Sequence, residues 1–562
     1  MVGRSLMSPF WLIGAACGLS LAWLLPNHTY PWLGFHGDAW SAVMLALISV
    51  FVFWKNKCAV GWYWSSMAVC IMVVIPLLQW VTGLIPIFGV AWINFAYLLG
   101  LLLAMHLGAA WEFESPGQVM DFLFTAIGIA AVVSVGLQLR QFFQLESIGP
   151  YTMYSTGSRH FANMAQPNQL ASLLLLGVVG CAWGYGRSKL GAMTAVSIAA
   201  LLLVGLAITE SRTGWVNIAL LMAIAAIWRR LLPSARFLYA VVGLGVFFLV
   251  CVLVLPMAYA VNNGGVAPAF RSPVGDPRWS AWLMFLKAAA HNPILGFGWG
   301  QTGHAQFLMM DDKIVQGGNF LHAHNMVIDL IIWNGIPMGL AISILMLWWV
   351  WIVIKNVRDF SHLAKVAFLM ILGVHAMLEY PLQYAFFLLP AGMVAGSLNL
   401  SSGQVVFGAG RKWLMGTLLA LALITLVVTV QDYFKVERSF YALRFELKNI
   451  PTSLSREPPE VLALTQWREH IQFVRMEPQT NVRPIQLEWM REVAMTTPSA
   501  YAMYRLALML AMNDMVGEAQ LWLRRACQTS PGDHCDAIRN QWKERSSENS
   551  KYAAVAWPEE FR

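Results

Sequence analysis

The stretch Phe237–Ala258, FLYAVVGLGVFFLVCVLVLPMA, contains no charged residue over a length that can cross a lipid bilayer. A membrane-spanning helix needs about 20 predominantly apolar residues, and about 17 can suffice. Similar runs, some of them shorter, alternate with polar gaps up to about residue 430. The full set lies near residues 9–25, 39–54, 60–80, 90–107, 121–139, 168–185, 191–208, 215–228, 237–258, 326–354, 364–378, 384–398 and 413–430.

Composition agrees with a membrane protein. Charged residues make up only 12% of the 562 residues, whereas ordinary soluble domains carry roughly 25%. The sequence therefore predicts an all-α polytopic membrane protein with about 12–13 transmembrane helices. This count treats 326–354 as one span, although Asn334-Gly335 and Pro337 interrupt it. Its first part could instead be a re-entrant or interfacial helix.

Lysine and arginine residues mark one side of the predicted bundle. If the N-terminus is cytoplasmic, the inner connections contain basic residues such as Arg229 and Lys355, whereas the short outer connection 81–89 contains none. This is the positive-inside pattern. It predicts a multi-pass protein of the bacterial inner membrane, with the long connection 259–325 and the tail 431–562 in the periplasm. The net charge of +8 then follows mostly from topology, and no long basic run indicates nucleic-acid binding.

The tail differs in composition from the rest of the chain and contains no spanning run. Amphipathic patterns at 499–510 and 516–527, separated by Asn513-Asp514, predict two helices that resemble one tetratricopeptide-like unit. Cys527 and Cys535 could form a disulfide in an oxidising compartment. The predicted organisation is transmembrane helices in 1–258, a periplasmic connection in 259–325, transmembrane helices in 326–430 and a periplasmic helical domain in 431–562.

Polar groups gather on the predicted outer side. Arginines in RHFANMAQPNQ (159–169), in TESRTG (209–214) and at Arg278 oppose the positive-inside rule, so they are not orientation signals. A guanidinium binds phosphate oxygens bidentately, which suits a phosphate-bearing ligand. Structural explanations remain open, because Asn168 could cap a helix while Pro167 fixes the preceding turn.

HAMLEYPLQY (375–384) is a further polar group on this side. Placing an acidic side chain such as that of Glu379 close to the membrane interior costs free energy, so such residues are usually paired or functional. Tyr380 and Tyr384 could simply be interfacial residues. Gly296, Gly298 and Gly300 could form plain turns or an anion-binding backbone nest.

His322, His324 and Asn325 stand at the mouth of the 326–354 run. Two histidines without a cysteine or paired carboxylates are weak support for a zinc site, so we expect no metal. A neutral imidazole can accept a hydroxyl proton, and nearby arginines can stabilise a departing diphosphate. A polyprenyl-diphosphate donor fits this combination, because its chain needs the bilayer and its diphosphate needs cations.

At these residues the chain resembles the bacterial protein O-oligosaccharyltransferases, the pilin-glycosylation ligases of the O-antigen ligase and polymerase superfamily. The similarity extends over nearly the whole chain. It is carried by Leu25-Pro26-Asn27-His28 with Pro31, Phe35 and Asp38, by Pro76-Leu77-Leu78-Gln79 with Gly83, by Gln166-Pro167-Asn168, by Ser211-Arg212-Thr213-Gly214, by His324-Asn325 with Gly335 and Gly339, and by His375 with Glu379-Tyr380-Pro381-Leu382.

The resemblance implies a GT-C-like fold and transfer of an oligosaccharide, without metal or cofactor, from undecaprenyl diphosphate to a serine or threonine of a pilin-like periplasmic protein. It implies that His324 is the catalytic histidine and that Arg212 contacts the diphosphate; the extra His322 leaves open which imidazole acts. The expected substrate-binding residues are His28, Arg159, Gln166, Asn168, Arg278, Asn325, Glu379 and Tyr380.

Two alternatives remain. One is an enzyme with another acceptor: an O-antigen ligase that transfers to the lipid A core, or an O-antigen polymerase. The other is a flippase that moves a lipid-linked sugar without making bonds. A flippase predicts charged residues in the middle of the spans, and the sequence contains almost none there.

Overall fold

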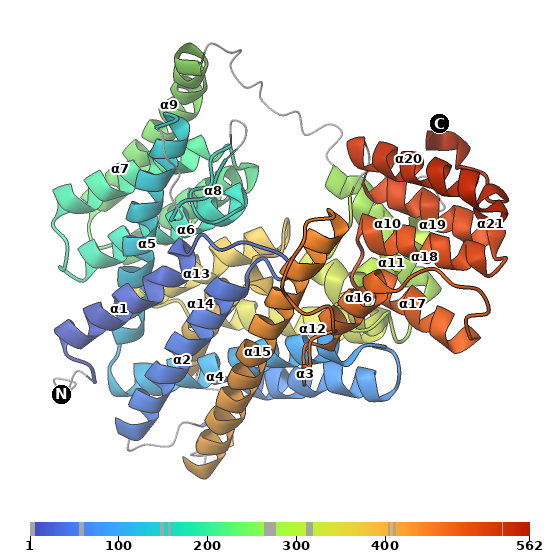
Figure 1. Cartoon of the computed structure of the whole chain (residues 1–562). Helices are drawn as coiled ribbons and strands as arrows, with labels where there is room; N and C mark the ends of the chain where they lie inside the picture. The colour runs from blue at the N-terminus through green and yellow to red at the C-terminus, as the bar shows by residue number, and fades with distance from the viewer. Residues whose placement is uncertain are drawn as a thin grey trace. The chain divides into compact units, whose positions relative to one another are not determined.

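The computed structural model of the chain describes residues 6–55, 61–145, 151–155, 159–263, 277–310, 318–402, 405–407, 412–530 and 532–561. The described chain is almost entirely helical (Figure 1). It divides into two compact units. Unit 1 comprises residues 1–72, 97–272 and 345–426, and unit 2 comprises residues 73–96, 273–344 and 427–562.

Every predicted apolar run forms a helix. Among the residues that the structure describes, eight helices are long and apolar enough to cross a membrane, and the remaining runs form shorter apolar helices. The fold is therefore that of a polytopic membrane protein. The helices are α1 (Pro9–Leu24), α2 (Phe35–Lys55), α3 (Trp64–Val81), α4 (Phe88–Glu114), α5 (Gln118–Phe142), α6 (Pro167–Gly186), α7 (Ala192–Ile208), α8 (Arg212–Ile227), α9 (Ala235–Asn263), α12 (Met326–Lys355), α13 (Phe360–Ala376), α14 (Ala385–Ser402) and α15 (Lys412–Leu447).

Two short strands accompany the helices of unit 1: β1 (Trp62–Tyr63) pairs antiparallel with β2 (Val405–Phe407). Within the predicted 259–325 connection lie α10 (Pro277–His291) and α11 (Thr302–Met309). Residues 264–276 and 311–317 of that connection are outside the described residues.

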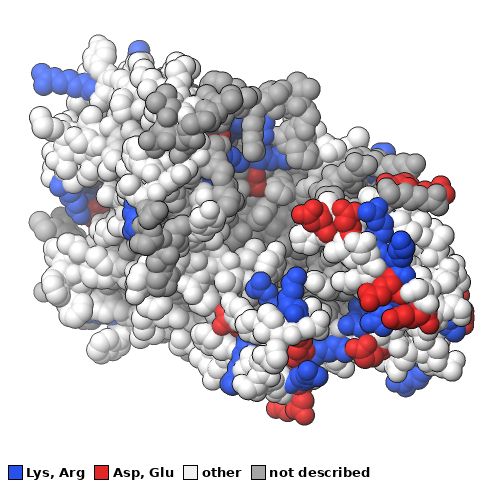
Figure 2. All heavy atoms as spheres, turned by 45° about the horizontal axis from the view of Figure 1, so that its top comes forward, with Lys and Arg blue, Asp and Glu red and all other residues white. Residues whose placement is uncertain are grey.

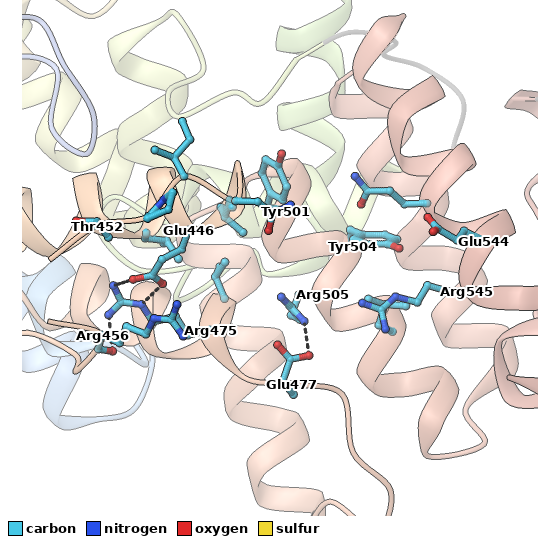
Figure 3. A pocket seen from close by; sticks show the side chains of 18 residues that line it. Glu446, Thr452, Arg456, Arg475, Glu477, Tyr501, Tyr504, Arg505, Glu544 and Arg545 are labelled. Carbon is cyan, nitrogen blue, oxygen red and sulfur yellow. Dashed lines mark hydrogen bonds and ion pairs between the residues drawn. The ribbon is translucent and has the colours of Figure 1, made fainter. Parts of the chain in front are cut away.

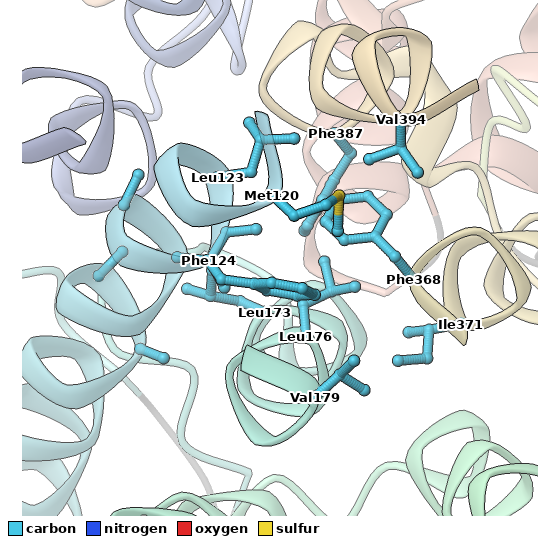
Figure 4. Close-up of a cluster of buried hydrophobic side chains, with 14 of the residues drawn as sticks. Met120, Leu123, Phe124, Leu173, Leu176, Val179, Phe368, Ile371, Phe387 and Val394 are labelled. Carbon is cyan, nitrogen blue, oxygen red and sulfur yellow. The ribbon is translucent and has the colours of Figure 1, made fainter. Parts of the chain in front are cut away.

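A central part of the core of unit 1 is formed by α5, α6, α13 and α14 (Figure 4). Phe124 of α5 lies between Trp183 of α6 and Phe368 of α13, with ring centroids 6.1 and 5.9 Å away. In its most apolar window α6 is 72% buried, whereas α9 is only 17% buried. A helix that is apolar on all sides belongs either in a core or in lipid. The difference therefore makes α6 a central helix and leaves α9 as a lipid-facing one.

Glycines allow α4 and α14 to approach closely. A Cβ added at Gly108 would meet the backbone of Met393, and one added at Gly396 would meet the backbone of Met105. Small residues at such crossings let helix backbones pack in contact, which is the usual basis of helix association in a membrane.

Helix α12 consists of two helices that meet at Gly335, whose φ of 77° and ψ of 167° are not helical. The predicted break is therefore confirmed. Pro337 has no N–H to offer the Trp333 carbonyl one turn earlier. The loop after α10 replaces the missing helical bonds: the N–H of Phe297 donates to Ile332 O at 2.8 Å, that of Gly298 to Trp333 O at 3.1 Å, and that of Ile336 to Pro293 O at 2.7 Å.

The C-terminal part of unit 2 begins with the end of α15. The predicted domain boundary at Gln431 falls inside this 36-residue helix, which runs on without a break to Leu447. The tail then contains α16 (Thr465–Arg475), α17 (Pro484–Thr496), α18 (Ala500–Met512), α19 (Val516–Thr529), α20 (Asp533–Glu548) and α21 (Ser550–Ala553).

The predicted helix pair 499–510 and 516–527 is confirmed as α18 and α19, which pack together. Their inner faces form a core that includes Met503, Leu506 and Leu510. Cys527 and Cys535 are joined as a disulfide between α19 and α20. Charged side chains gather over these C-terminal helices, whereas most of the other described surface in the same view is uncharged (Figure 2).

Candidate active site

The polar cluster of unit 1 begins at the start of α6. Gln166 is the N-cap of this helix, since its side-chain oxygen accepts a hydrogen bond from the N–H of Gln169 at 2.7 Å, and Pro167 occupies the first helical position. The interpretation of Asn168 as the cap is therefore wrong. Its amide is instead used for contacts with other segments.

Asn168 joins three segments that the sequence analysis singled out separately. Its Oδ1 accepts hydrogen bonds from Arg159 Nη2 at 3.2 Å and from Ser211 Oγ at 2.7 Å, and its Nδ2 donates to Glu379 Oε1 at 3.0 Å. Arg159 Nε also donates to the Thr209 carbonyl at 3.1 Å. Asn168 is only 4% exposed, so this is a buried network that fixes the 159–169, 209–214 and 375–384 segments against one another.

Arg212 is the first residue of α8, directly after the N-cap Ser211. Ser211 Oγ accepts from the N–H of Gly214 at 3.0 Å while donating to Asn168. A helix N-terminus presents backbone N–H groups and a partial positive charge, which favour a bound anion. The half-buried Arg212 guanidinium adds a full charge at that end. The start of α8 therefore has the chemistry of an anion site.

The tyrosines after Glu379 are close to each other. The rings of Tyr380 and Tyr384 stack with centroids 6.1 Å apart. Burial raises the pKa of both phenols above its ordinary value, and neighbouring Glu379 adds to the effect on Tyr380. Both therefore stay neutral hydrogen-bond donors at physiological pH. His375, one turn before Glu379, has its Nδ1 2.8 Å from the Ser172 hydroxyl of α6.

The His28 side chain links two segments of unit 1. Its ring nitrogens lie 3.0 Å from the Leu33 carbonyl and 2.8 Å from the Asn163 carbonyl. Burial lowers the pKa of the imidazole although both carbonyls favour the charged form. A neutral ring donates to only one of them at a time. His28 thus ties the α1–α2 connection to the segment that leads into α6.

Asp38 is a polar residue of unit 1 to which the sequence analysis gave no role. Its carboxylate accepts from the Tyr97 hydroxyl at 2.7 Å and from the N–H of Ala385, the first residue of α14, at 2.6 Å. It is 5% exposed. The available signal was an acidic residue in the first turn of an apolar helix, the same argument that singled out Glu379.

The histidine cluster belongs to unit 2. His324 has a φ of 55°, a left-handed conformation that is uncommon outside glycine and that tends to be held at functional sites. Its ring meets that of Phe320 edge-to-face, with centroids 6.0 Å apart. Asn325 caps α12, because its Oδ1 accepts from the N–H groups of Val327 and Ile328 at 3.1 and 3.2 Å. The cap fixes the point at which the chain leaves His324.

The Asp329 side chain, in the first turn of α12, binds the backbone of the histidine segment. Its Oδ1 accepts from the N–H of Ala323 at 2.8 Å and from the Thr302 hydroxyl at 3.2 Å. The same hydroxyl accepts from Trp333 Nε1 at 2.8 Å. Asp329 is 3% exposed. Sequence reasoning missed it, although an acidic side chain at the start of an apolar helix was again the signal.

The two histidines have different surroundings. Burial, with a smaller contribution from His324, lowers the pKa of His322 to about 3. The His322 ring packs edge-on against Trp333 at 6.2 Å. An imidazole with so low a pKa is a poor proton acceptor near neutral pH. The low pKa therefore counts against His322 as the acting imidazole, the choice that the sequence left open.

Arg278 lies in the first turn of α10 and is half-buried. The glycine-rich segment that follows α10 has positive φ at Gly296, Gly298 and Gly300. The N–H groups of residues 297 and 298 donate to carbonyls of α12. The segment is therefore a turn that clamps the α12 break, and these two amides are not directed at an anion.

The tail contains an open pocket of about 890 Å³ between the end of α15 and helices α16, α18 and α20 (Figure 3). Arg475 forms a bidentate ion pair with Glu446, in which Nε donates to Oε2 and Nη2 donates to Oε1, each at 3.0 Å. Arg505 lies 3.5 Å from Glu477. The pocket therefore presents charges of both signs, and much of its basic character is neutralised internally.

Comparison with known proteins agrees with these features. A family model described as O-antigen ligase matches residues 197–343, one described as protein glycosylation ligase matches residues 161–183, and one described as the C-terminal part of a virulence factor membrane-bound polymerase matches residues 363–544. The segments around Asn168, Arg212 and His324 all fall within these matches.

Two curated proteins of Acinetobacter baylyi are similar over most of their length. A general O-oligosaccharyltransferase is 30% identical over 527 residues, which cover 91% of this chain and 90% of the relative. A ComP-specific O-oligosaccharyltransferase is 25% identical over 425 residues, which cover 72% of this chain and 74% of the relative. The chain belongs to the bacterial O-oligosaccharyltransferases, glycosyl-transferring membrane enzymes of the O-antigen ligase superfamily.

Proposed function

We propose that this enzyme transfers an oligosaccharide from undecaprenyl diphosphate to serine or threonine hydroxyls of a periplasmic protein such as a pilin. The observation that carries the proposal is the buried network in which Asn168 holds Arg159, Ser211 and Glu379 together beside Arg212. Such a network places cationic groups at a helix N-terminus within an otherwise apolar bundle. A donor with a lipid chain and a diphosphate needs both environments.

On the donor side, Arg212 and the N-terminus of α8 bind the diphosphate. Arg159 is held by Asn168 and the Thr209 carbonyl, so its guanidinium is oriented before a ligand arrives. A cation that is already oriented stabilises developing negative charge without rearranging during the reaction. Glu379, Tyr380, Gln166 and His28 then serve to hold these segments or to contact the glycan.

On the acceptor side, His324 orients the hydroxyl and accepts its proton. The hydroxyl oxygen bonds to the anomeric carbon, the bond from that carbon to the diphosphate oxygen breaks, and undecaprenyl diphosphate leaves with the bonding electrons. The proton that His324 accepted returns to water. No nucleotide is needed, because the glycosyl diphosphate bond is already activated.

A second acceptor class has specific support. The matches to O-antigen ligase and to a membrane-bound polymerase favour, as the alternative, transfer of the same donor glycan to the lipid A core or to another glycan. The donor site would be the same in each case. Only the identity of the acceptor separates these functions.

The test is glycosylation in cells that make a lipid-linked glycan, with a pilin-like acceptor and lipopolysaccharide analysed from the same cultures. His324→Ala and Arg212→Ala should abolish the mass shift of the acceptor. His362→Ala and Arg229→Ala, which change the same residue types elsewhere in the chain, should not. Glycosylated pilin from the first two variants at normal membrane levels would refute the residue roles. Glycan found only on lipopolysaccharide would move the assignment to the ligase alternative.

A further inference from the structure

Helix α11 (Thr302–Met309) lies between the histidine segment and the C-terminal helices, all within unit 2. We propose that the C-terminal domain positions the His322–His324 segment through this helix, and that Gln306 is the residue that transmits the position. The inference rests on the proposed function, because it concerns the segment that contains His324. It gives the C-terminal domain a part in catalysis.

One face of α11 holds the chain that leads to the histidines. Gln306 Oε1 accepts from the N–H of Phe320 at 2.8 Å, and Gln306 Nε2 donates to the Gly318 carbonyl at 3.0 Å. Gln306 is 3% exposed. Four residues earlier, Thr302 holds Asp329, which in turn binds the N–H of Ala323 between the two histidines. The helix therefore fixes the backbone on both sides of His322.

The opposite face of α11 is held by the C-terminal domain. His304 Nε2 lies 3.0 Å from Glu492 Oε2 of α17. The Phe307 ring packs against Trp522 of α19 with centroids 5.6 Å apart. Two carbonyls at the C-terminal end of α11 also accept hydrogen bonds from α19: Arg525 Nη2 donates to Phe307 O at 3.0 Å and Gln528 Nε2 donates to Met310 O at 3.3 Å.

The length of α11 makes these contacts necessary. It has 8 residues, and isolated helices shorter than about 12–15 residues are barely stable in water. The last carbonyls of a helix have no partners within it, and here Arg525 and Gln528 supply them. Without the C-terminal domain, α11 loses both its packing surface and its C-terminal hydrogen bonds. The Gln306 side chain would then no longer define where Phe320 lies.

Phe320 links the hydrogen bonds of Gln306 to the His324 side chain. Its ring contacts both Phe285 of α10, with centroids 6.1 Å apart, and the His324 imidazole at 6.0 Å. A shift of the Phe320 backbone therefore moves the aromatic ring against which the His324 imidazole packs. Misplacement of a reacting group by about 1 Å can lower a rate roughly 100-fold. The effect should appear in kcat, with little change in the affinity for either substrate.

The experiment uses the full-length purified enzyme, a lipid-linked oligosaccharide and a protein acceptor, and compares Gln306→Leu, Gln306→Glu and Arg525→Ala. Gln306→Leu keeps the approximate volume but removes both hydrogen bonds, so kcat should fall roughly tenfold to 100-fold with KM values nearly unchanged. Arg525→Ala should reduce kcat in the same way. Gln520→Ala and Arg524→Ala, which alter the same residue types on α19 away from α11, are the matched controls and should retain wild-type kcat.

Gln306→Glu separates positioning from general stability. A protonated glutamic acid can accept from Phe320 and donate to Gly318 as glutamine does, whereas the carboxylate repels the Gly318 carbonyl. Its kcat relative to wild type should therefore rise as the pH falls, while the KM values stay nearly unchanged. A flat ratio across pH, or wild-type kcat in Gln306→Leu and Arg525→Ala, overturns the inference.

His324→Ala in the same assay keeps the two proposals apart. If His324→Ala is inactive while Gln306→Leu and Arg525→Ala turn over normally, the positioning role fails and the proposed function stands. If His324→Ala turns over normally, the assigned role of His324 fails, and with it the basis of the positioning role.

Discussion

The Asn168 side chain donates a hydrogen bond to Glu379 Oε1 at 3.0 Å while its carbonyl oxygen accepts from Arg159 and Ser211. An amide can do this because it carries a donor and an acceptor on one planar group. No aspartate or alanine at this position satisfies all three partners. The polar cluster of unit 1 therefore depends on this one side chain.

The first prediction concerns that amide. Asn168→Ala should lower transfer activity strongly, because buried Glu379 and Ser211 each lose a partner at a cost of about 1–3 kcal/mol per group. Asn168→Asp should be worse, since it replaces the donor to Glu379 with a second carboxylate. Asn356→Ala, which removes an amide whose side-chain hydrogen bonds go only to nearby Ile352 and Arg358, is the control. In vitro transfer at equal enzyme levels measures the effect, and equal activity of the two Asn168 variants would argue against the like-charge explanation.

A second prediction concerns the stability of the C-terminal domain in acid. Burial lowers the pKa of His470 to about 4, and its Nδ1 lies 2.9 Å from the Thr497 hydroxyl. The unfolded chain, with a histidine pKa of about 6.5, binds this proton more readily than the folded chain. Stability is therefore lost as the pH falls from about 6.5 towards 4, by about 2 kcal/mol at pH 5.

His470→Gln cannot titrate and should flatten this acid sensitivity, whereas His534→Gln, at an exposed position of α20, should not. The measurement is the thermal midpoint for proteolysis of the tail in the full-length protein at pH 7 and pH 5. An identical drop for wild type and His470→Gln would exclude His470 as the source.

The spans could be predicted from sequence because lipid offers the backbone no hydrogen-bond partners, so an apolar run of that length must form a helix. The break at Gly335 was equally local, since Gly and Pro act on their own neighbours. The partners of Asn168 could not be predicted: Ser211 and Glu379 lie far along the chain, and only packing of α6, α8 and α13 brings them together. The contacts of α11 with α17 and α19 depend on the same kind of long-range packing. The cap at Gln166 is local, but the sequence has two amides, Gln166 and Asn168, beside Pro167 and does not show which of them caps the helix.

A third prediction concerns the disulfide between Cys527 and Cys535, which are 8 residues apart. By the chain-entropy model, closing so short a loop stabilises the folded domain by about 2–3 kcal/mol. Replacing both cysteines by serine should lower the unfolding midpoint of the tail and leave one fewer disulfide in intact-mass analysis. Cys17→Ser, in α1, is the control. The idea fails if the double variant melts like the wild type and the wild-type protein carries two free thiols at these positions.

The final prediction concerns Gly335. Its φ of 77° and ψ of 167° fall in a region that is essentially restricted to glycine and costs other residues about 1–3 kcal/mol. A Cβ there would also run into the backbone carbonyl of Ile294. Gly335→Ala should therefore push the loop after α10 away from α12 and release the bonds from residues 297 and 298 to its carbonyls.

The loop after α10 leads directly into α11, which holds the histidine segment. Gly335→Ala should therefore reduce transfer activity as well as stability. Gly243→Ala makes the same substitution in α9, where an added methyl meets nothing within 4 Å, and should behave as wild type. Membrane level, thermal midpoint and transfer rate are measured for both variants. If Gly335→Ala matches Gly243→Ala in all three measurements, the α12 break does not depend on glycine. The hydrogen bonds from the loop after α10 would then not be what holds the N-terminal end of α12, which follows the histidines.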